Sequence, residues 1–153
     1  MRIKTPQRKE RESQLPQPET HRDRYLLGMD IRRKVMGELH VVQALGQASD
    51  FTRPVQELIT EYAWGEIWGR PGLGLKTRSM LNIGMLVALN RSQELAGHVR
   101  GALNNGVSEQ EIQEILLQAL IYCGAPAALE SFRVAEKTIS EYRSEFPTPI
   151  PEH

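Results

Sequence analysis

The 153-residue chain is 40% hydrophobic and 25% charged, which suits one soluble domain with its own core. Lysine plus arginine equals aspartate plus glutamate at 19 each, so the chain lacks the basic surplus typical of nucleic-acid binders. A single cysteine, Cys123, excludes an intrachain disulfide and any cysteine-cluster metal site. Without a long apolar run or a signal-peptide pattern, we expect a cytoplasmic protein that binds neither membrane nor nucleic acid.

The two ends of the sequence differ from its middle. Residues 1–20 are polar, contain three prolines and show no apolar period, which predicts a disordered arm. Residues 146–153 alternate proline with other residues and form a tail that cannot continue a helix. Between them, apolar residues recur at helical spacing without strand alternation, so residues 21–145 predict an all-α domain of about six helices.

The first three helices are separated by recognisable turns. The first covers residues 21–37, and the second begins after Asp50 with Pro54 in its first turn. A Pro-Gly segment over residues 70–74 then breaks the chain, and the third helix covers residues 76–90. This third helix is apolar on most of its circumference, which is typical of a central helix or of one buried between subunits.

The last three helices have clear end signals. The fourth covers residues 92–104 and stops at Gly106 in a left-handed conformation. The fifth opens with the capping box Ser108-x-x-Glu111 and ends at Gly124, and the sixth follows to about residue 143. Their apolar faces, with the third helix, exceed what a monomer of this size comfortably covers, so we expect a homo-oligomer that also buries Trp64, Trp68 and Leu89 between subunits.

One set of polar residues indicates chemistry. Arg91, Glu94 and His98 are spaced i, i+3 and i+7, so they share one face of the fourth helix. A carboxylate one turn from an imidazole fixes its tautomer and raises its pKa, which suits a proton donor near neutral pH. The alternative reading is a solvated face of charged side chains.

Other candidates are weaker. Arg70 lies in the Pro-Gly turn, and Arg78 interrupts an apolar helix, so it needs either an anionic ligand or an ion pair with a neighbouring helix. Arg100 is expected to face away from His98, because residues two apart do not share a helical face. His40 falls in an expected turn, where a lone histidine is more often structural, and Cys123 fits a small core residue. The histidine spacing predicts no metal site.

Several segments match a known family in order and in register. They are residues 63–73 (AWGEIWGRPGL), 76–83 (KTRSMLNI), 88–91 (ALNR), 98–108 (HVRGALNNGVS), 114–118 (EILLQ) and 121–128 (IYCGAPAA). The chain resembles the 4-carboxymuconolactone decarboxylases over about residues 25–141.

The resemblance implies an alkylhydroperoxidase-like helical fold assembled as a trimer or hexamer. It also implies cofactor-free decarboxylation of 4-carboxymuconolactone to the β-ketoadipate enol-lactone in protocatechuate catabolism. In the related peroxidases, the helix that corresponds to residues 91–98 carries Cys-x-x-Cys followed by histidine. Arg91 and Glu94 stand at those cysteine positions here, which disfavours redox activity and places the polar trio at the equivalent site.

We therefore expect His98 to donate a proton, oriented by Glu94, while arginines bind the carboxylate of the lactone. The substrate-binding candidates are Arg78, Arg91, Arg70, Trp64, Tyr122 and His40. A homologue that acts as a decarboxylase or isomerase on a different lactone or β-keto acid remains an alternative, because fold analogy does not fix the substrate. A non-enzymatic helical assembly protein is the third reading.

Overall fold

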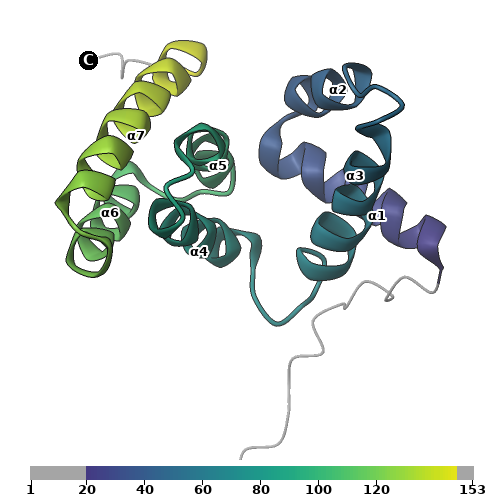
Figure 1. Ribbon diagram of the computed structural model, residues 1–153, viewed down its shortest axis with the longest axis horizontal. Coiled ribbons are helices and arrows are strands. Elements are labelled where there is room, and N and C mark those ends of the chain that lie inside the picture. Colours follow the sequence, from purple (N-terminus) through teal and green to yellow (C-terminus); the bar gives the residue numbers. More distant parts are fainter. Residues whose placement is uncertain (1–19, 148–153) are drawn as a thin grey trace, which may run out of the picture.

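A computed structural model describes residues 20–147 of the chain. Across this range, seven α-helices and one π-helical segment form two bundles, and no strand occurs among the described residues (Figure 1). The predicted all-α, alkylhydroperoxidase-like class is confirmed. The predicted arm over residues 1–20 and the tail over residues 146–153 lie almost wholly outside the described residues.

The first bundle contains α1 (His21–Met36), α2 (Glu38–Gly46), α3 (Arg53–Leu58) and the π-helix η1 (Ile59–Ile67). The Thr20 hydroxyl caps the start of α1 by accepting a hydrogen bond from the Asp23 backbone N–H, and α1 ends before Gly37, whose φ is 91°. Helix α2 is a correction to the predicted turn around His40. Its nine residues are too few for the apolar spacing to show a helical period.

Helix α1 and η1 approach each other at two glycines. A Cβ on Gly28 would lie 1.9 Å from the Thr60 carbonyl oxygen, and one on Gly65 would lie 2.1 Å from the Arg24 carbonyl oxygen. Only glycine permits this backbone-to-backbone contact. The contact fixes the part of η1 that carries Trp64.

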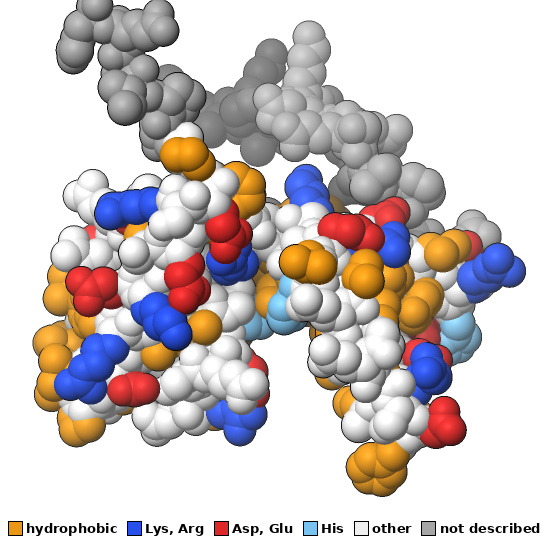
Figure 2. Space-filling view, turned by 90° about the horizontal axis from the view of Figure 1, so that it is seen from above, with side chains coloured by type: hydrophobic (Ala, Val, Ile, Leu, Met, Phe, Trp, Pro, Cys, Tyr) orange, Lys and Arg blue, Asp and Glu red, His pale blue; other side chains and the backbone are white. Residues whose placement is uncertain are grey.

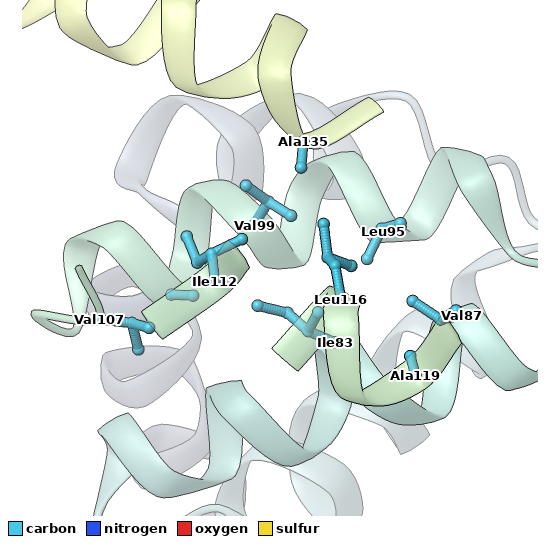
Figure 3. Packing of buried hydrophobic residues seen from close by; sticks show 10 residues of the cluster. Ile83, Val87, Leu95, Val99, Val107, Ile112, Leu116, Ala119 and Ala135 are labelled. Carbon is cyan, nitrogen blue, oxygen red and sulfur yellow. The ribbon is translucent and has the colours of Figure 1, made fainter. Parts of the chain in front are cut away.

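The second bundle contains α4 (Leu75–Ala88), α5 (Ser92–Asn104), α6 (Glu109–Cys123) and α7 (Ala125–Glu145). Its core is a single cluster of aliphatic side chains drawn from all four helices, with Ile83, Leu95 and Leu116 at its centre (Figure 3). The predicted capping box of Ser108 and Glu111 is present, and Gly106 has a φ of 80°. These local signals place the helix boundaries close to where the sequence predicts them.

The outer face of α4 argues against the first of the two predicted alternatives, a helix buried at the centre of one subunit. Ile83 and Val87 are buried, but Leu81, Met85 and Leu89 are 50%, 53% and 67% exposed. One subunit therefore leaves part of the apolar surface of α4 exposed. Burial between subunits, the second alternative, would account for it. Trp64 and Trp68 were expected to be buried between subunits, but they are buried within the subunit itself.

The two bundles meet where the end of α1 contacts α5. Gly97 and Gly101 of α5 face Met36 and Val35, whose side-chain atoms would each lie 3.1 Å from an added Cβ. The Asn104 side chain donates a hydrogen bond to the Val35 carbonyl oxygen at 2.8 Å. Beside this junction the surface is hollowed, and histidine side chains lie in the hollow (Figure 2). None of the described helices is both long enough and apolar enough to span a bilayer.

Candidate active site

The centre of the site is His98, which α5 holds against two tryptophans of the first bundle. The His98 ring lies 6.4 Å from the Trp64 ring at an interplanar angle of 7°, and 6.5 Å from the Trp68 ring at 26°. The two indoles also contact each other, with centroids 4.7 Å apart. The tryptophans belong to η1 and its C-terminal cap, so the imidazole sits where the two bundles meet.

Asn82 of α4 is the hydrogen-bond partner of His98. Its Nδ2 lies 3.3 Å from His98 Nδ1. Because an amide nitrogen can only donate, Nδ1 accepts this hydrogen bond, and the neutral imidazole carries its proton on Nε2. This partner was not predicted from the sequence, since Asn82 lies 16 residues before His98 on another helix.

The electrostatics of His98 are opposite to the prediction. Burial, together with the nearby charge of His40, lowers the pKa of His98 below its ordinary value, and the Glu94 carboxylate opposes this shift only in part. The prediction of a raised imidazole pKa is therefore wrong. The cause is that His98 is more buried, and nearer to other cationic groups, than a helix-surface position would be.

Glu94 makes its hydrogen bonds to Arg91 and not to His98. The guanidinium of Arg91 donates to both carboxylate oxygens, including a bond of 3.1 Å from Nε to Oε2. Both side chains are exposed, at 58% and 42%. Glu94 and His98 both belong to α5, and Arg91 is its N-cap residue, outside the helix. The expected hydrogen bond between Glu94 and His98 is replaced by the ion pair of Glu94 and Arg91. Arg91 lowers the pKa of Glu94, which keeps the carboxylate ionised.

Arg78, in the first turns of α4, reaches back to the segment between η1 and α4 that carries Arg70. The Arg78 guanidinium donates to the carbonyl oxygens of Leu73 and Arg70, both at 3.2 Å. Arg78 therefore satisfies backbone carbonyls of the turn, which is neither of the two partners weighed from the sequence. Arg70 lies 3.7 Å from Glu66 at the surface.

The remaining candidates divide between the two bundles. His40, in the first turn of α2, is near enough for its charge to lower the pKa of His98. Tyr122 lies near the end of α6 and is 79% exposed, so the structure does not bury it beside the imidazole. Arg100 faces away from His98 as expected and binds Glu145 of α7 at 2.6 Å and 2.7 Å. Cys123 packs against the aliphatic core, as expected.

Arg32 of α1 is a residue that sequence reasoning missed. It is only 6% exposed, and it lies on the face of α1 that buries Met29 and Val35. The signal was present, because an arginine three residues from two core positions falls in the apolar register of the helix. Burial, and then the nearby charge of Arg32, lowers the pKa of His40.

A groove of about 540 Å³ lies between α6 and α7, lined by apolar residues such as Ile112, Leu116 and Phe132. Its rim carries the ion pair of Arg143 and Glu109. The lining contains none of the residues predicted for the site. The His98 cluster is therefore a separate feature at the junction of the bundles.

Several known proteins are similar to this chain. The sequence model of the Carboxymuconolactone decarboxylase family matches residues 53–137. A nitrosuccinic acid decarboxylase from Metarhizium robertsii is 48% identical over 123 residues, covering 80% of this chain and 86% of that protein. A 4-carboxymuconolactone decarboxylase from Acinetobacter baylyi is 41% identical over 118 residues, covering 77% of this chain and 88% of that protein.

The matched region of the family includes η1, both tryptophans, Asn82 and His98. Both similar proteins are decarboxylases, and the carboxy-lyase class predicted from the sequence is confirmed. The chain belongs to the carboxymuconolactone decarboxylase family.

Proposed function

We propose that the chain decarboxylates a small acid whose leaving carboxylate is attached to a carbon that is conjugated with an electron-accepting group. The observation that carries this proposal is His98, packed against two indoles and hydrogen-bonded by Asn82. Loss of CO₂ leaves an electron pair on carbon, so the reaction needs delocalisation of that pair and a proton for the carbon. A positioned imidazolium supplies the proton.

The proposed decarboxylation begins with cleavage of a carbon–carbon bond and ends with proton transfer from His98. The bond between the carboxylate and its carbon breaks, CO₂ departs, and the electron pair is delocalised into the acceptor group. The Nε2–H of protonated His98 then transfers its proton to the carbon at which the delocalised pair forms the new C–H bond. This carbon is the one that lost CO₂ in a nitro acid and the lactone α-carbon in 4-carboxymuconolactone, where the double bond moves to give the enol-lactone. The neutral imidazole regains a proton from water. In the free protein, the lowered pKa of His98 disfavours its protonated form. A bound anionic substrate raises the pKa of a nearby imidazole and therefore favours protonated His98.

The residues around His98 have supporting roles in this proposal. Trp64 and Trp68, 5% and 8% exposed, shield one side of the imidazole from water. Asn82 orients the neutral ring through Nδ1. In the imidazolium Nδ1 carries a proton, so the Asn82 amide must present its Oδ1 to accept it. Glu94 acts through its charge. Arg70, Arg78 and Arg91 stay candidates for carboxylate binding, as the family resemblance implies, although each has a partner within the chain.

Two substrates fit this chemistry. In 4-carboxymuconolactone, the acid predicted from the sequence, the unsaturated lactone accepts the electron pair. In nitrosuccinic acid the nitro group accepts the electron pair. This chain is more similar to the nitrosuccinic acid decarboxylase than to the 4-carboxymuconolactone decarboxylase, which supports nitrosuccinic acid as the other candidate substrate. Neither reaction needs a cofactor in this scheme.

The direct test measures CO₂ release from both acids by the purified chain and by His98→Gln. We expect turnover of at least one acid, and its loss in the variant. His21→Gln is the matched control, because His21 is a surface histidine that binds Glu61. Turnover that survives in His98→Gln, or inertness of the unmodified chain toward both acids, contradicts the proposal.

We also propose a homo-oligomer, a trimer or a hexamer. Large apolar side chains that one subunit leaves exposed occur on both α4 and α6, including Leu89 at 67% and Ile121 at 78%. Such surface is usually buried between subunits. Analytical ultracentrifugation tests this, and a monomer at micromolar concentration contradicts it.

A further inference from the structure

The chain crosses from the first bundle to the second in residues 68–74, between η1 and α4 (Figure 1). Residues 70–74 are all exposed, so core packing does not hold them. Positions 69, 72 and 74 are glycines, and glycine restricts the backbone less than any other residue. The conformation of this segment, which begins with Trp68, therefore depends on hydrogen bonds.

Arg78 supplies such hydrogen bonds from the first turn of α4. Its Nε donates to the Leu73 carbonyl oxygen and its Nη2 donates to the Arg70 carbonyl oxygen, both at 3.2 Å. In the part of the chain that the structure describes, no other side chain donates to a backbone oxygen of this segment. The Arg70 backbone N–H donates in turn to the Ile67 carbonyl oxygen at 3.2 Å, which ties the segment to the end of η1.

The hydrogen bonds of Arg78 complete a ring of contacts that includes His98. Asn82 lies one turn after Arg78 on α4, and its side chain is hydrogen-bonded to the imidazole at 3.3 Å. Trp68 comes two residues before Arg70 and packs against the same imidazole, with the ring centroids 6.5 Å apart. Helix α4 therefore contacts His98 directly through Asn82, and it holds Trp68 through the segment that Arg78 binds.

The edge of the Arg78 guanidinium that faces this segment is fully used. A guanidinium binds a carboxylate through two N–H groups on one edge. Nε and Nη2 of Arg78 form such an edge, and both already donate to the carbonyl oxygens of Leu73 and Arg70. A carboxylate on this edge would displace both carbonyl oxygens and release the segment. Holding the segment and binding a substrate through this edge therefore exclude each other.

We propose that Arg78 is a positioning residue, which fixes Trp68 against His98 by holding the segment between the bundles. The inference rests on the proposed function in that His98 is the reacting group. It removes Arg78 from the candidates for carboxylate binding and leaves Arg70 and Arg91. Trp68 is 8% exposed and shields the imidazole from water, so a displaced Trp68 admits water and lets the ring tilt. The loss of Arg78 should therefore act on the chemical step.

NMR spectra of the protein without substrate test the position of the rings. The imidazole of His98 lies beside two indoles, so their ring currents displace its proton signals. Arg78→Met removes both hydrogen bonds of the guanidinium and should shift the ring signals of His98 and Trp68. Arg133→Met is the matched control, because Arg133 is an exposed arginine that pairs with Glu130 on α7, and it should leave these signals in place. His98 signals that do not move in Arg78→Met overturn the proposal.

Steady-state kinetics with the acid that the chain decarboxylates separate positioning from substrate binding. We expect Arg78→Met to lower kcat by about 10- to 100-fold and to change KM by less than about threefold. Arg78→Lys keeps the charge but lacks the two-pronged edge, so its kcat should lie between those of Arg78→Met and the unmodified chain. A raised KM with an unchanged kcat would mean that Arg78 binds the substrate, and it overturns the proposal.

Hydrogen exchange in the unmodified chain covers the case in which Arg78→Met does not fold. The Nε–H of Arg78 should exchange with water more slowly than that of Arg133, because it is bonded to the Leu73 carbonyl oxygen. Equal exchange rates overturn the proposal. The NMR measurements need no turnover, so a chain that decarboxylates neither test acid would contradict the proposed reaction while the position of Trp68 is still tested.

Discussion

The imidazole of His98 lies nearly parallel to the indole of Trp64, with 7° between the two planes and 6.4 Å between their centroids. Contacts with α1 fix the position of each ring. The contact of α5 with the end of α1 places His98, and the contact of η1 with the middle of α1 places Trp64. Helix α1 therefore sets the geometry of the site, although His98 and Trp64 both lie outside it.

The pH profile of kcat/KM should report the lowered pKa of His98. If protonated His98 donates the proton, activity is present below its folded-state pKa and is lost as the pH rises through it. Because burial and His40 lower that pKa, the decline should be centred below the ordinary histidine value of 6.5. The measurement is kcat/KM for a reacting acid between pH 5 and pH 9.

His40→Gln supplies the control for this profile. Removing a like charge should raise the pKa of His98 and move the decline to higher pH. Glu94 also acts on His98, but it is unchanged in the variant, so any shift comes from His40. An activity that increases with pH would mean that His98 acts in its neutral form.

Asn82→Asp should move the same decline to higher pH. The substitution places a carboxylate of nearly equal size within hydrogen-bonding distance of His98 Nδ1, and this charge stabilises the imidazolium. Asn82→Leu removes the hydrogen bond without adding charge and should lower kcat. An unshifted profile in Asn82→Asp, measured beside the unmodified chain, would show that Asn82 does not orient the reacting imidazole.

The helices were predictable where the apolar spacing or the capping residues that mark them lie within a single helix. Residues 92–104 were predicted as the helix that became α5, and the capping box of Ser108 and Glu111 marked the start of α6. Helix α2 was missed because nine residues carry too little period. The π-helix was missed because the apolar spacing of residues 59–67 does not distinguish it from an α-helix.

The candidate site was predictable only in part for the same reason. The spacing of Arg91, Glu94 and His98 predicts a shared helical face, but it does not determine which two of the side chains form a hydrogen bond. The exposed carboxylate pairs with a guanidinium three residues away, while the imidazole turns toward α4 and η1. Asn82 reaches His98 from another helix, so no pattern within α5 indicates it.

Glu94→Gln tests whether this carboxylate acts directly or through its charge. The structure favours action through its charge, because the Glu94 side chain is exposed and pairs with Arg91. Loss of the negative charge should lower the pKa of His98 and move the decline of kcat/KM to lower pH. The low-pH plateau should fall by less than about tenfold, consistent with the small energies of exposed ion pairs. A larger loss of the plateau would assign Glu94 a direct part in the reaction.

Gly28→Ala should destabilise the fold and with it the site, because the new Cβ would meet the Thr60 carbonyl oxygen at 1.9 Å. The backbones of α1 and η1 must then separate, at a cost of about 1–3 kcal/mol or more in the free energy of unfolding. Gly84→Ala is the matched control, since a Cβ there meets nothing within 4 Å in the middle of α4. It should be neutral or stabilise the protein by up to about 1 kcal/mol. Urea denaturation measures both variants, and equal midpoints would refute the close approach of α1 to η1 that positions Trp64.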